Sequence, residues 1–143
     1  MRWTEDEYQE YIQKRQGGKV YKPKNNIITV YGELPDLNTI IDQSKSHWAN
    51  YSKMKKTYTS RVAQAAIGAK RVKKADIDIT YYCKNRRKDP DNIIGGGNKF
   101  VLDGLVKAGV IENDGWRHVN SLNCRCRLDK DNPRVEIRIR ETG

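Results

Sequence analysis

The sequence predicts an α+β fold with α/β-like order, in which helices pack on a single mixed four-stranded sheet. Segments of alternating apolar and polar residues are separated by segments with apolar residues at helical spacing, in the order α-β-α-β-α-β-β. The 143 residues suffice for one hydrophobic core. A hydrophobic content of 36% and a charged content of 32% are polar for a folded chain but do not indicate disorder.

The first element is predicted to be an appended helix, which separates residues 1–18 from a main domain at residues 19–143. Thr4 and Glu7 have the spacing of a capping box, and a glycine pair ends the helical pattern. The stretch NIITVY at residues 26–31 is rich in β-branched side chains and predicts the first strand.

The next segment predicts helix, because its apolar residues recur every three or four positions. Either Asp36 or Asn38 is expected to cap it. The pattern allows one long helix or two helices broken near Asn50–Ser52. Tyr51 and Tyr58 lie among the lysines of this segment and could stack on bases while the lysines bind phosphates. Burial in the core is nevertheless the more usual role for tyrosine.

The remaining elements are a strand at residues 75–83, a helix at residues 100–108, and strands at residues 117–128 and 134–140. The strands show apolar and polar alternation. The helix closes at an Ala-Gly pair, as C-terminal caps often do. A turn rich in aspartate, asparagine and proline joins the last two strands.

The charge of the chain favours a polyanionic partner, because the net charge is +10 and the pI is about 9.6. A 23-residue stretch from residue 53 contains basic residues and no acidic one, whereas ordinary solvated faces mix the two signs. Nucleic acid is the leading partner, and an anionic membrane surface is the weaker alternative. The predicted DNA-binding residues are Lys53, Lys55, Lys56, Arg61, Lys70, Arg71, Lys73, Lys74, Lys84, Arg86, Arg87 and Lys88.

The sequence predicts a cytosolic protein that does not insert into a membrane. No apolar run approaches the roughly 20 residues needed to cross a bilayer, and Thr4–Glu7 replaces the basic and apolar lead of a secretion signal. An odd set of cysteines, Cys83, Cys124 and Cys126, agrees with a reducing compartment. With His118 they could form a zinc set, but their spacing matches no usual pattern, so buried apolar cysteines are favoured.

The motif Asp89-Pro90-Asp91-Asn92 follows a basic run, where a strand gives way to a helix. Alone, these residue types are typical of helix caps and turns. Asp114 follows the next helix, and an excursion of this length could fold it back beside the pair. Three clustered carboxylates repel one another unless a cation neutralises them. Mg²⁺ suits such a site because it binds carboxylates, waters and substrate phosphates. Another acidic pair, Asp76 and Asp78, is expected to face solvent at the far end of its strand.

This motif, followed by Lys99, Leu102-Asp103-Gly104-Leu105, Ala108-Gly109 and Glu112-Asn113-Asp114, resembles the RusA family of Holliday junction resolvases. The resemblance covers about residues 84–120, and the element order agrees over residues 26–140. It implies a small homodimeric endonuclease that uses Mg²⁺, with Mn²⁺ as an alternative, and makes paired nicks in four-way DNA. It also implies a bacterial cell, with a phage or prophage gene as the source.

The resemblance assigns roles to four residues. Asp89, Asp91 and Asp114 would be catalytic and would bind the metal. Lys99 would be catalytic and would stabilise charge at the scissile phosphate. Lys99 comes eight residues after Asp91, however, whereas the family usually has a spacing of four, and Gly95-Gly96-Gly97 lies in the gap. Either the helix is lengthened and the lysine stays on the same side, or the glycines are non-helical and bring main-chain N–H groups to a phosphate.

A second departure lies after the helix, where Asn113 stands at a position that often holds another aspartate in the family. This leaves Asp114 as the expected ligand, with Glu112 as an alternative. Asp103 is expected to support the helix or to reach Lys99 rather than to bind metal. Two other functions stay open from the sequence. One is a non-catalytic nucleic-acid-binding module whose aspartates only cap the helix, and the other is a nuclease for flaps or other branched DNA.

Overall fold

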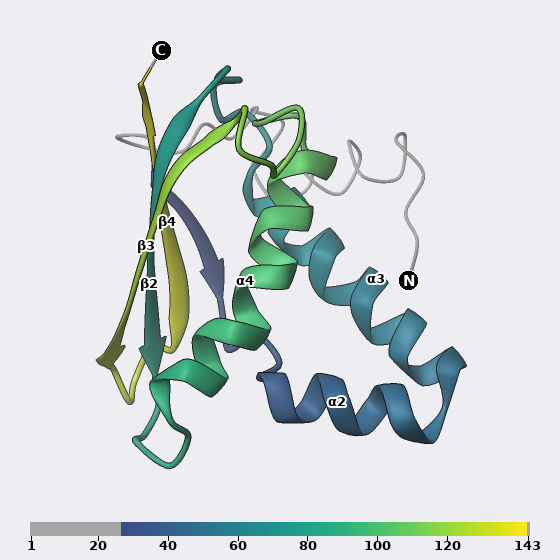
Figure 1. Cartoon of the computed structure of the whole chain (residues 1–143). Helices are drawn as coiled ribbons and strands as arrows, with labels where there is room; N and C mark the ends of the chain where they lie inside the picture. Colours follow the sequence, from purple (N-terminus) through teal and green to yellow (C-terminus); the bar gives the residue numbers. More distant parts are fainter. Residues whose placement is uncertain (1–26, 143) are drawn as a thin grey trace, which may run out of the picture.

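A computed structural model describes residues 27–142 (Figure 1). The predicted α+β fold and element order are confirmed in this range, and the helical segment after the first strand forms two helices, which is one of the two predicted alternatives. The predicted appended helix at residues 1–18 lies outside the described residues. The elements are β1 (Ile27–Tyr31), α2 (Leu37–Ser46), α3 (Trp48–Ala65), β2 (Ala75–Cys83), α4 (Pro90–Lys107), β3 (Val119–Leu128) and β4 (Arg134–Glu141).

The sheet is mixed, with the strand order β1-β4-β2-β3. β2 and β3 run parallel, whereas β4 is antiparallel to both β1 and β2. Parallel neighbours need a crossover connection, and α4 supplies it. The helix therefore starts at the end of the sheet where β2 stops, and finishes at the end where β3 begins (Figure 1). This connection decides where the predicted site residues lie.

The helices lie on one face of the sheet (Figure 1). Ile79, Cys124 and Ile137 are register partners and share that inner face, where Ile79 and Ile137 are completely buried. Val101 and Leu105 of α4 are also completely buried against it. The alternation predicted for the strands follows from this one-sided cover, since every second side chain faces the helices.

The first helical segment is divided at His47, whose extended backbone (φ −147°) ends α2 and precedes α3. The break therefore comes before the predicted position at Asn50–Ser52. Asp36 is the N-cap residue of α2, because its Oδ1 atom accepts the Thr39 N–H at 2.7 Å. This observation decides between Asp36 and Asn38 as the predicted cap.

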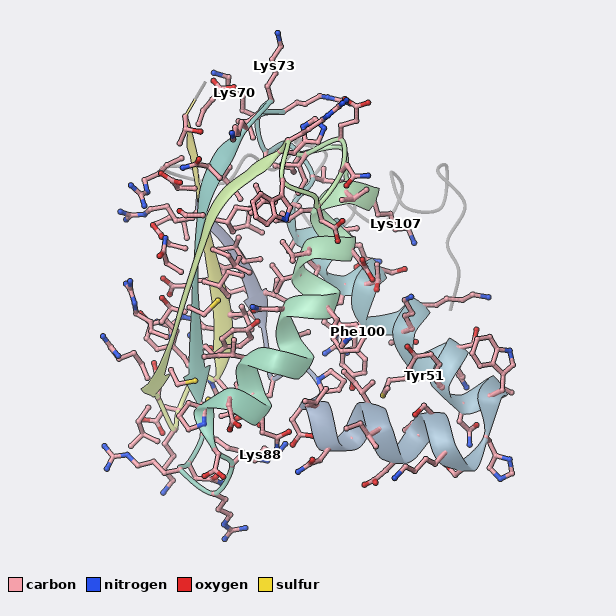
Figure 2. The ribbon with its side chains drawn as sticks, in the orientation of Figure 1. Tyr51, Lys70, Lys73, Lys88, Phe100 and Lys107 are labelled. Carbon is pink, nitrogen blue, oxygen red and sulfur yellow. The ribbon has the colours of Figure 1, made fainter. Side chains whose placement is uncertain are left out.

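The tyrosines of α3 pack in the interior rather than standing free on the surface. The ring of Tyr58 lies 5.7 Å from that of Phe100 in α4, and the Arg61 guanidinium lies 4.8 Å from the Tyr58 ring centre. Tyr51 is half-buried and packs against the core. Figure 2 shows Tyr51 and Phe100 between α3 and α4. The core role predicted as the more usual one is therefore the role observed for both tyrosines.

α4 is longer than predicted. It begins at Pro90, ten residues before the expected start at Phe100, and runs without interruption to Lys107. The early turns were missed because Gly95, Gly96 and Gly97 carry no apolar side chain that could show a helical pattern, and glycine has a low intrinsic helix propensity. The alternative in which these glycines leave the segment non-helical is wrong.

Close packing explains why glycines occupy this part of α4. A methyl group at Gly96 would overlap the main chain of Pro35–Leu37, and one at Gly97 would overlap the ring of Tyr81. Gly104 lies equally close to Val62 of α3, at 2.5 Å from an added Cβ. α4 therefore approaches the β1–α2 connection, the sheet and α3 more closely than any residue with a side chain allows.

Among the residues that the structure describes, no helix is both long enough and apolar enough to cross a membrane.

Candidate active site

The N-terminal end of α4 presents two carboxylates to solvent. Asp89 is the N-cap residue, and its main-chain carbonyl accepts the N–H groups of Asn92 and Ile93 at 3.1 Å each. Its carboxylate makes no capping hydrogen bond. Asp91 lies in the first turn, and both aspartates are exposed. The simple capping role therefore fails for the Asp89 side chain, and both carboxylates stay available for a ligand.

The helix itself favours negative charge at this position. Unpaired N–H groups and the macrodipole give a helix N-terminus a partial positive charge, which stabilises nearby carboxylates. Pro90 is well placed at the first helical position because it has no N–H to lose. The sequence Asp-Pro-Asp thus starts a helix and also exposes two anionic groups two residues apart.

The connection between β1 and α2 holds this end of α4 in place. The Lys88 Nζ atom lies 3.1 Å from Oδ2 of Asp36, and the Asn38 N–H donates to Oδ1 of Asn92 at 2.9 Å. Burial raises the pKa of the Asp36 carboxyl, but hydrogen bonds from Thr39 and from the Lys88 ammonium outweigh it, so the pKa lies below its usual value. Sequence reasoning predicted Asp36 only as a cap and Lys88 only as a DNA contact, because residues so far apart in sequence give no sign of their pairing.

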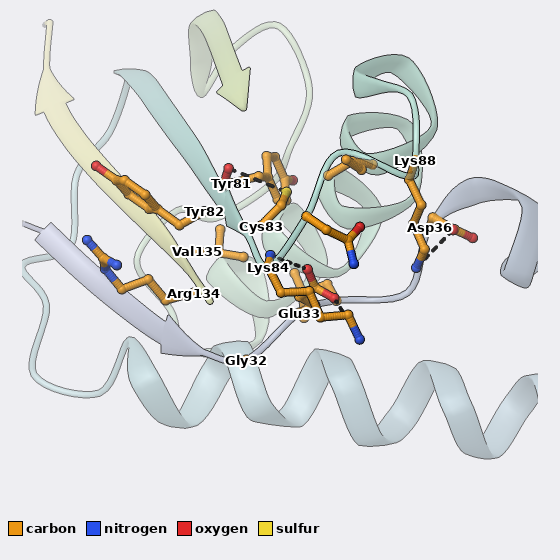
Figure 3. A pocket seen from close by; sticks show the side chains of 13 residues that line it. Gly32, Glu33, Asp36, Tyr81, Tyr82, Cys83, Lys84, Lys88, Arg134 and Val135 are labelled. Atoms are coloured by element: carbon orange, nitrogen blue, oxygen red, sulfur yellow. Dashed lines mark hydrogen bonds and ion pairs between the residues drawn. The ribbon is translucent and has the colours of Figure 1, made fainter. Parts of the chain in front are cut away.

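A small hollow of about 40 Å³ adjoins these contacts (Figure 3). Its lining includes Glu33, whose carboxylate accepts the Lys84 N–H at 3.1 Å and lies 3.9 Å from the Lys84 ammonium. On the opposite side, the Arg134 guanidinium lies 3.9 Å from the centre of the Tyr82 ring. The loop that leads from β2 to Asp89 is therefore tied to the β1–α2 connection by charged contacts.

The middle of α4 and the loop that follows the helix carry the other predicted site residues. Asp114 and Lys99 are exposed, and with Asp103 they line a hollow of about 330 Å³ between α4 and α3. Tyr51 and Lys55 contribute to the same hollow from α3. The Lys99 position follows from the uninterrupted helix: it lies about 12 Å along the axis and roughly 80° around it from Asp91. Lys99 therefore groups with Asp114 and not with the aspartate pair.

Asn113 has a structural role beside Asp114. Its side-chain oxygen accepts the Gly115 N–H at 2.8 Å, which closes a local turn. Glu112 is exposed and lies 4.0 Å from the ring of His118. Asn113 is thus explained by the loop conformation, and the carboxylate of Asp114 is left without a hydrogen-bond partner among the described residues.

The chain does not bring its three predicted metal ligands together. Asp89 and Asp91 lie at the start of the 18-residue α4, whereas Asp114 shares a hollow with Asn98, Lys99 and Asp103 from the middle of this helix. Between residues 27 and 142, no group of three His, Cys, Asp or Glu side chains is arranged to hold a metal ion. Asp114 therefore folds back toward the middle of α4, and the metal-binding role of the three aspartates stays a prediction.

The predicted DNA-binding residues fall into groups at both ends of the molecule. Lys70 and Lys73 lie at the end of the sheet where α4 finishes, and Lys88 lies at the opposite end (Figure 2). Three of the predicted lysines already have partners, since Lys70 pairs with Glu141, Lys84 with Glu33 and Lys88 with Asp36. The exposed members without an ion pair among the described residues are Lys53, Lys55, Lys56, Arg61, Arg71, Lys73, Arg86 and Arg87.

Asp76 and Asp78 lie on the sheet face that the helices leave uncovered, and both have structural partners. Asp76 accepts hydrogen bonds from Ser121 at 2.6 Å and Asn120 at 2.8 Å, which lower its pKa. Asp78 pairs with Arg140 at 3.0 Å. The pair was expected to face solvent, and its position on the uncovered face of the sheet agrees with this expectation.

The cysteines line the inner face near the end of β2. Cys83 is buried, and burial raises the pKa of its thiol to about 11. Cys124 and Cys126 are half-buried, and burial raises their pKa values as well. The burial of Cys83 and the partial burial of the other two agree with their predicted role as small apolar side chains.

A basic α+β chain with unpaired carboxylates at a helix start, flanked by cationic loops, has the features of a protein that processes nucleic acid. Over residues 7–140, nearly the whole chain, it matches the family described as Endodeoxyribonuclease RusA. The chain therefore belongs to the RusA family of endodeoxyribonucleases, and the resemblance seen in the motif is confirmed. The match begins inside the segment predicted to be appended, and the domain boundary at residue 18 stays a prediction. No match was found among curated proteins.

Proposed function

We propose that this protein is a homodimeric endonuclease that resolves four-way DNA junctions by paired nicks. Membership of the RusA family supports action on branched DNA. The observation that carries the proposal is the pair of exposed carboxylates at the start of α4, of which Asp89 occupies the N-cap position without capping. A side chain retained for helix stability would make that hydrogen bond. A cytoplasmic location in a bacterium and a phage or prophage origin belong to the same proposal.

The residues of this end fit a magnesium ion in part, with manganese as an alternative. Mg²⁺ is commonly held by one or two carboxylates, several waters and substrate phosphates. Asp89 and Asp91 supply two carboxylates that no cation of the described residues neutralises. When bound, such an ion supplies an activated water and stabilises negative charge on the phosphate.

The chain contributes binding and positioning around this pair. The exposed Arg86 and Arg87 precede the aspartates and would bind backbone phosphates near the cut. The exposed Lys53, Lys55 and Lys56 of α3 would bind the DNA further away. Lys99 would place a positive charge at the scissile phosphate, provided that it reaches the site.

A second copy of the chain would bring the separated site residues together. If two copies associate with their α4 helices antiparallel, Asp114 and Lys99 of one copy lie beside Asp89 and Asp91 of the other. The site is then complete only in the dimer, and a two-fold arrangement gives two identical sites for the two strands to be nicked.

β3 is the edge that fits this association. It pairs with β2 on one side, and it runs from the Asp114 end of the molecule to the Asp89 end. Its other edge pairs with no strand of residues 27–142, and a ten-residue edge of this kind is a ready surface for another strand. Leu122 and Trp116 are exposed along or beside this edge, at 38% and 95%. Antiparallel pairing of two β3 edges brings opposite ends of the two copies together, as the divided site requires.

A matched pair of variants tests this interface. Leu122→Glu should shift the sedimenting species from dimer to monomer and abolish cleavage. Tyr31→Glu is the control, because Tyr31 is an exposed residue of β1 at the other edge of the sheet. A dimer that persists in Leu122→Glu would exclude the β3 edge as the interface.

The activity itself is tested with a gel assay that compares a four-way junction with linear duplex and flap DNA, in Mg²⁺ or EDTA. The proposal requires paired nicks in the junction in Mg²⁺ and none in EDTA. Preferential cutting of flaps would keep the nuclease but change its substrate. A mobility shift without metal-dependent nicks would instead favour the non-catalytic binding module.

A further inference from the structure

We infer that the segment Pro35–Asn38 is a positioning clamp that sets the orientation of the carboxylate pair for metal binding. This inference rests on the proposed function, because it assumes that Asp89 and Asp91 hold a divalent ion. The clamp residues do not touch that ion. They act by fixing the start of α4, so Asp36 and Asn92 are positioning residues and not ligands.

Three contacts hold the start of α4, one from the loop directly before the helix and two from the helix itself. Lys88 pairs with Asp36 at 3.1 Å, Asn92 accepts the Asn38 N–H at 2.9 Å, and Gly96 packs directly on the main chain of Pro35–Leu37. Asn92 and Gly96 are four residues apart in α4, which is about one helical turn, so they lie on the same side of the helix. Lys88 fixes the loop that leads into Asp89. Together these contacts restrain the first turns of α4, which carry the exposed Asp89 and Asp91.

The burial of Asp36 makes the first contact specific. Asp36 is 5% exposed, and both of its carboxylate oxygens are engaged, Oδ1 by the Thr39 N–H and Oδ2 by Lys88. A buried carboxylate needs such partners, whereas an exposed one can exchange them for water. The Lys88 head group is therefore held in a single place directly before Asp89, although its side chain is half-exposed.

The clamp also explains the fourth residue of the Asp-Pro-Asp-Asn motif. The side chain of Asn92 accepts a main-chain N–H from the start of α2, so the asparagine joins two helix starts. Mutation of groups that orient metal ligands typically costs about 10- to 100-fold in metal affinity or activity. Because the clamp residues act only through α4, we expect metal affinity to fall by an amount at the lower end of that range, and we expect DNA binding to be unchanged.

The test measures Mn²⁺ binding to the DNA-free protein by the loss of the free-ion signal in electron paramagnetic resonance. Asp36→Asn keeps the oxygen that caps α2 but loses the charge that holds Lys88. We expect about 10-fold weaker Mn²⁺ binding in Asp36→Asn, in Lys88→Met and in Asn92→Ala. Lys88→Arg preserves the ion pair and should bind like the wild type. The double variant Asp36→Asn/Lys88→Met should bind Mn²⁺ no more weakly than either single variant, because both substitutions remove the same ion pair.

Two controls separate positioning from general stability. Ile137→Val in the core of the sheet should lower the melting temperature and leave Mn²⁺ affinity unchanged. Junction binding in EDTA should be unchanged in Asp36→Asn. Asn92→Ala removes a clamp contact without leaving a buried charge. Its Mn²⁺ affinity therefore tests the inference if Asp36→Asn does not fold.

The outcomes are distinct. If the wild type binds Mn²⁺ and the clamp variants bind it equally well, with lower melting temperatures only, the clamp is a stability contact and the inference is wrong. If the wild type neither binds Mn²⁺ nor cuts junctions, the proposed function fails, and the clamp fails with it.

Discussion

The two ends of α4 carry the same kind of residue in very different surroundings. At the N-terminal end, Asp89 and Asp91 project from a helix start that Asp36 and Asn38 tie to α2. At the C-terminal end, Asp114 stands on an exposed loop whose local order comes from the turn at Asn113. The comparison shows that the predicted site residues lie in two groups with different support. In the proposed function, the group that would orient two metal ligands is the one held by contacts to the β1–α2 connection.

The largest expected effect is at the firmly held end. Asp89→Asn should lower the rate of junction cleavage by about 1,000-fold, on the scale of removing a group that stabilises transition-state charge. The melting temperature should not fall, because the Asp89 carboxylate makes no capping hydrogen bond. Junction binding should persist. Lost binding together with residual metal-dependent cutting would contradict the role given to this residue.

The next effect is in the middle of α4. Lys99→Ala should lower cleavage by about 100-fold through the loss of one charge-stabilising group. Because Lys99 lies with Asp114 rather than with the aspartate pair, Mn²⁺ binding to the isolated chain should not change. Lys45→Ala, which removes an exposed lysine of α2, is the control for net charge. Near-normal turnover in Lys99→Ala would show that the lengthened helix has moved this lysine out of the site.

A third prediction concerns the glycines that bring α4 close to the clamp. Gly96→Ala should reduce the free energy of unfolding by about 1–3 kcal/mol, as overpacking does in well-packed interiors, because its methyl group meets the main chain of Pro35–Leu37. Gly95→Ala is the control, since its methyl group meets only the Leu37 side chain at 3.4 Å. It should be neutral or stabilise by about 0.5–1 kcal/mol through helix propensity. Urea titration of both variants checks this, and equal stability would argue against the close approach.

The smallest effect is the pH dependence of the clamp. The folded state lowers the pKa of Asp36 below its usual value. The ion pair therefore contributes stability above the pKa of the unfolded chain, and that contribution is lost as the pH falls through the folded pKa. The difference in unfolding free energy between the wild type and Asp36→Asn should thus shrink as the pH falls below about 5. A difference that is constant over this range would mean that the Asp36 charge does not matter for folding.

Local chemistry made most of the fold predictable from the sequence. The alternation in β2 and the β-branched residues of β1 specify strands wherever they pair. The start of α4 was not predictable, because Gly96 and Gly97 pack closely on Pro35–Leu37 and on Tyr81, and only the folded chain brings these residues near. Asp89 and Asp91 could be identified from their motif. The distance to Asp114 depends on the length of α4 and on the crossover between parallel strands, and neither is visible in a residue pattern.

The account is tested most directly by mixing inactive subunits. Asp89→Asn and Asp114→Asn chains are each expected to be inactive alone. The two chains are mixed in equal amounts, unfolded together and refolded, so that subunits exchange. Half of the dimers are then mixed, and each holds one intact site out of two, so the account predicts nicking at about a quarter of the wild-type rate. The control mixture of Asp89→Asn with Asp91→Asn should stay inactive, because both lesions lie in the same half. An inactive Asp89→Asn and Asp114→Asn mixture, in dimers shown to exchange, would contradict a site shared between two copies.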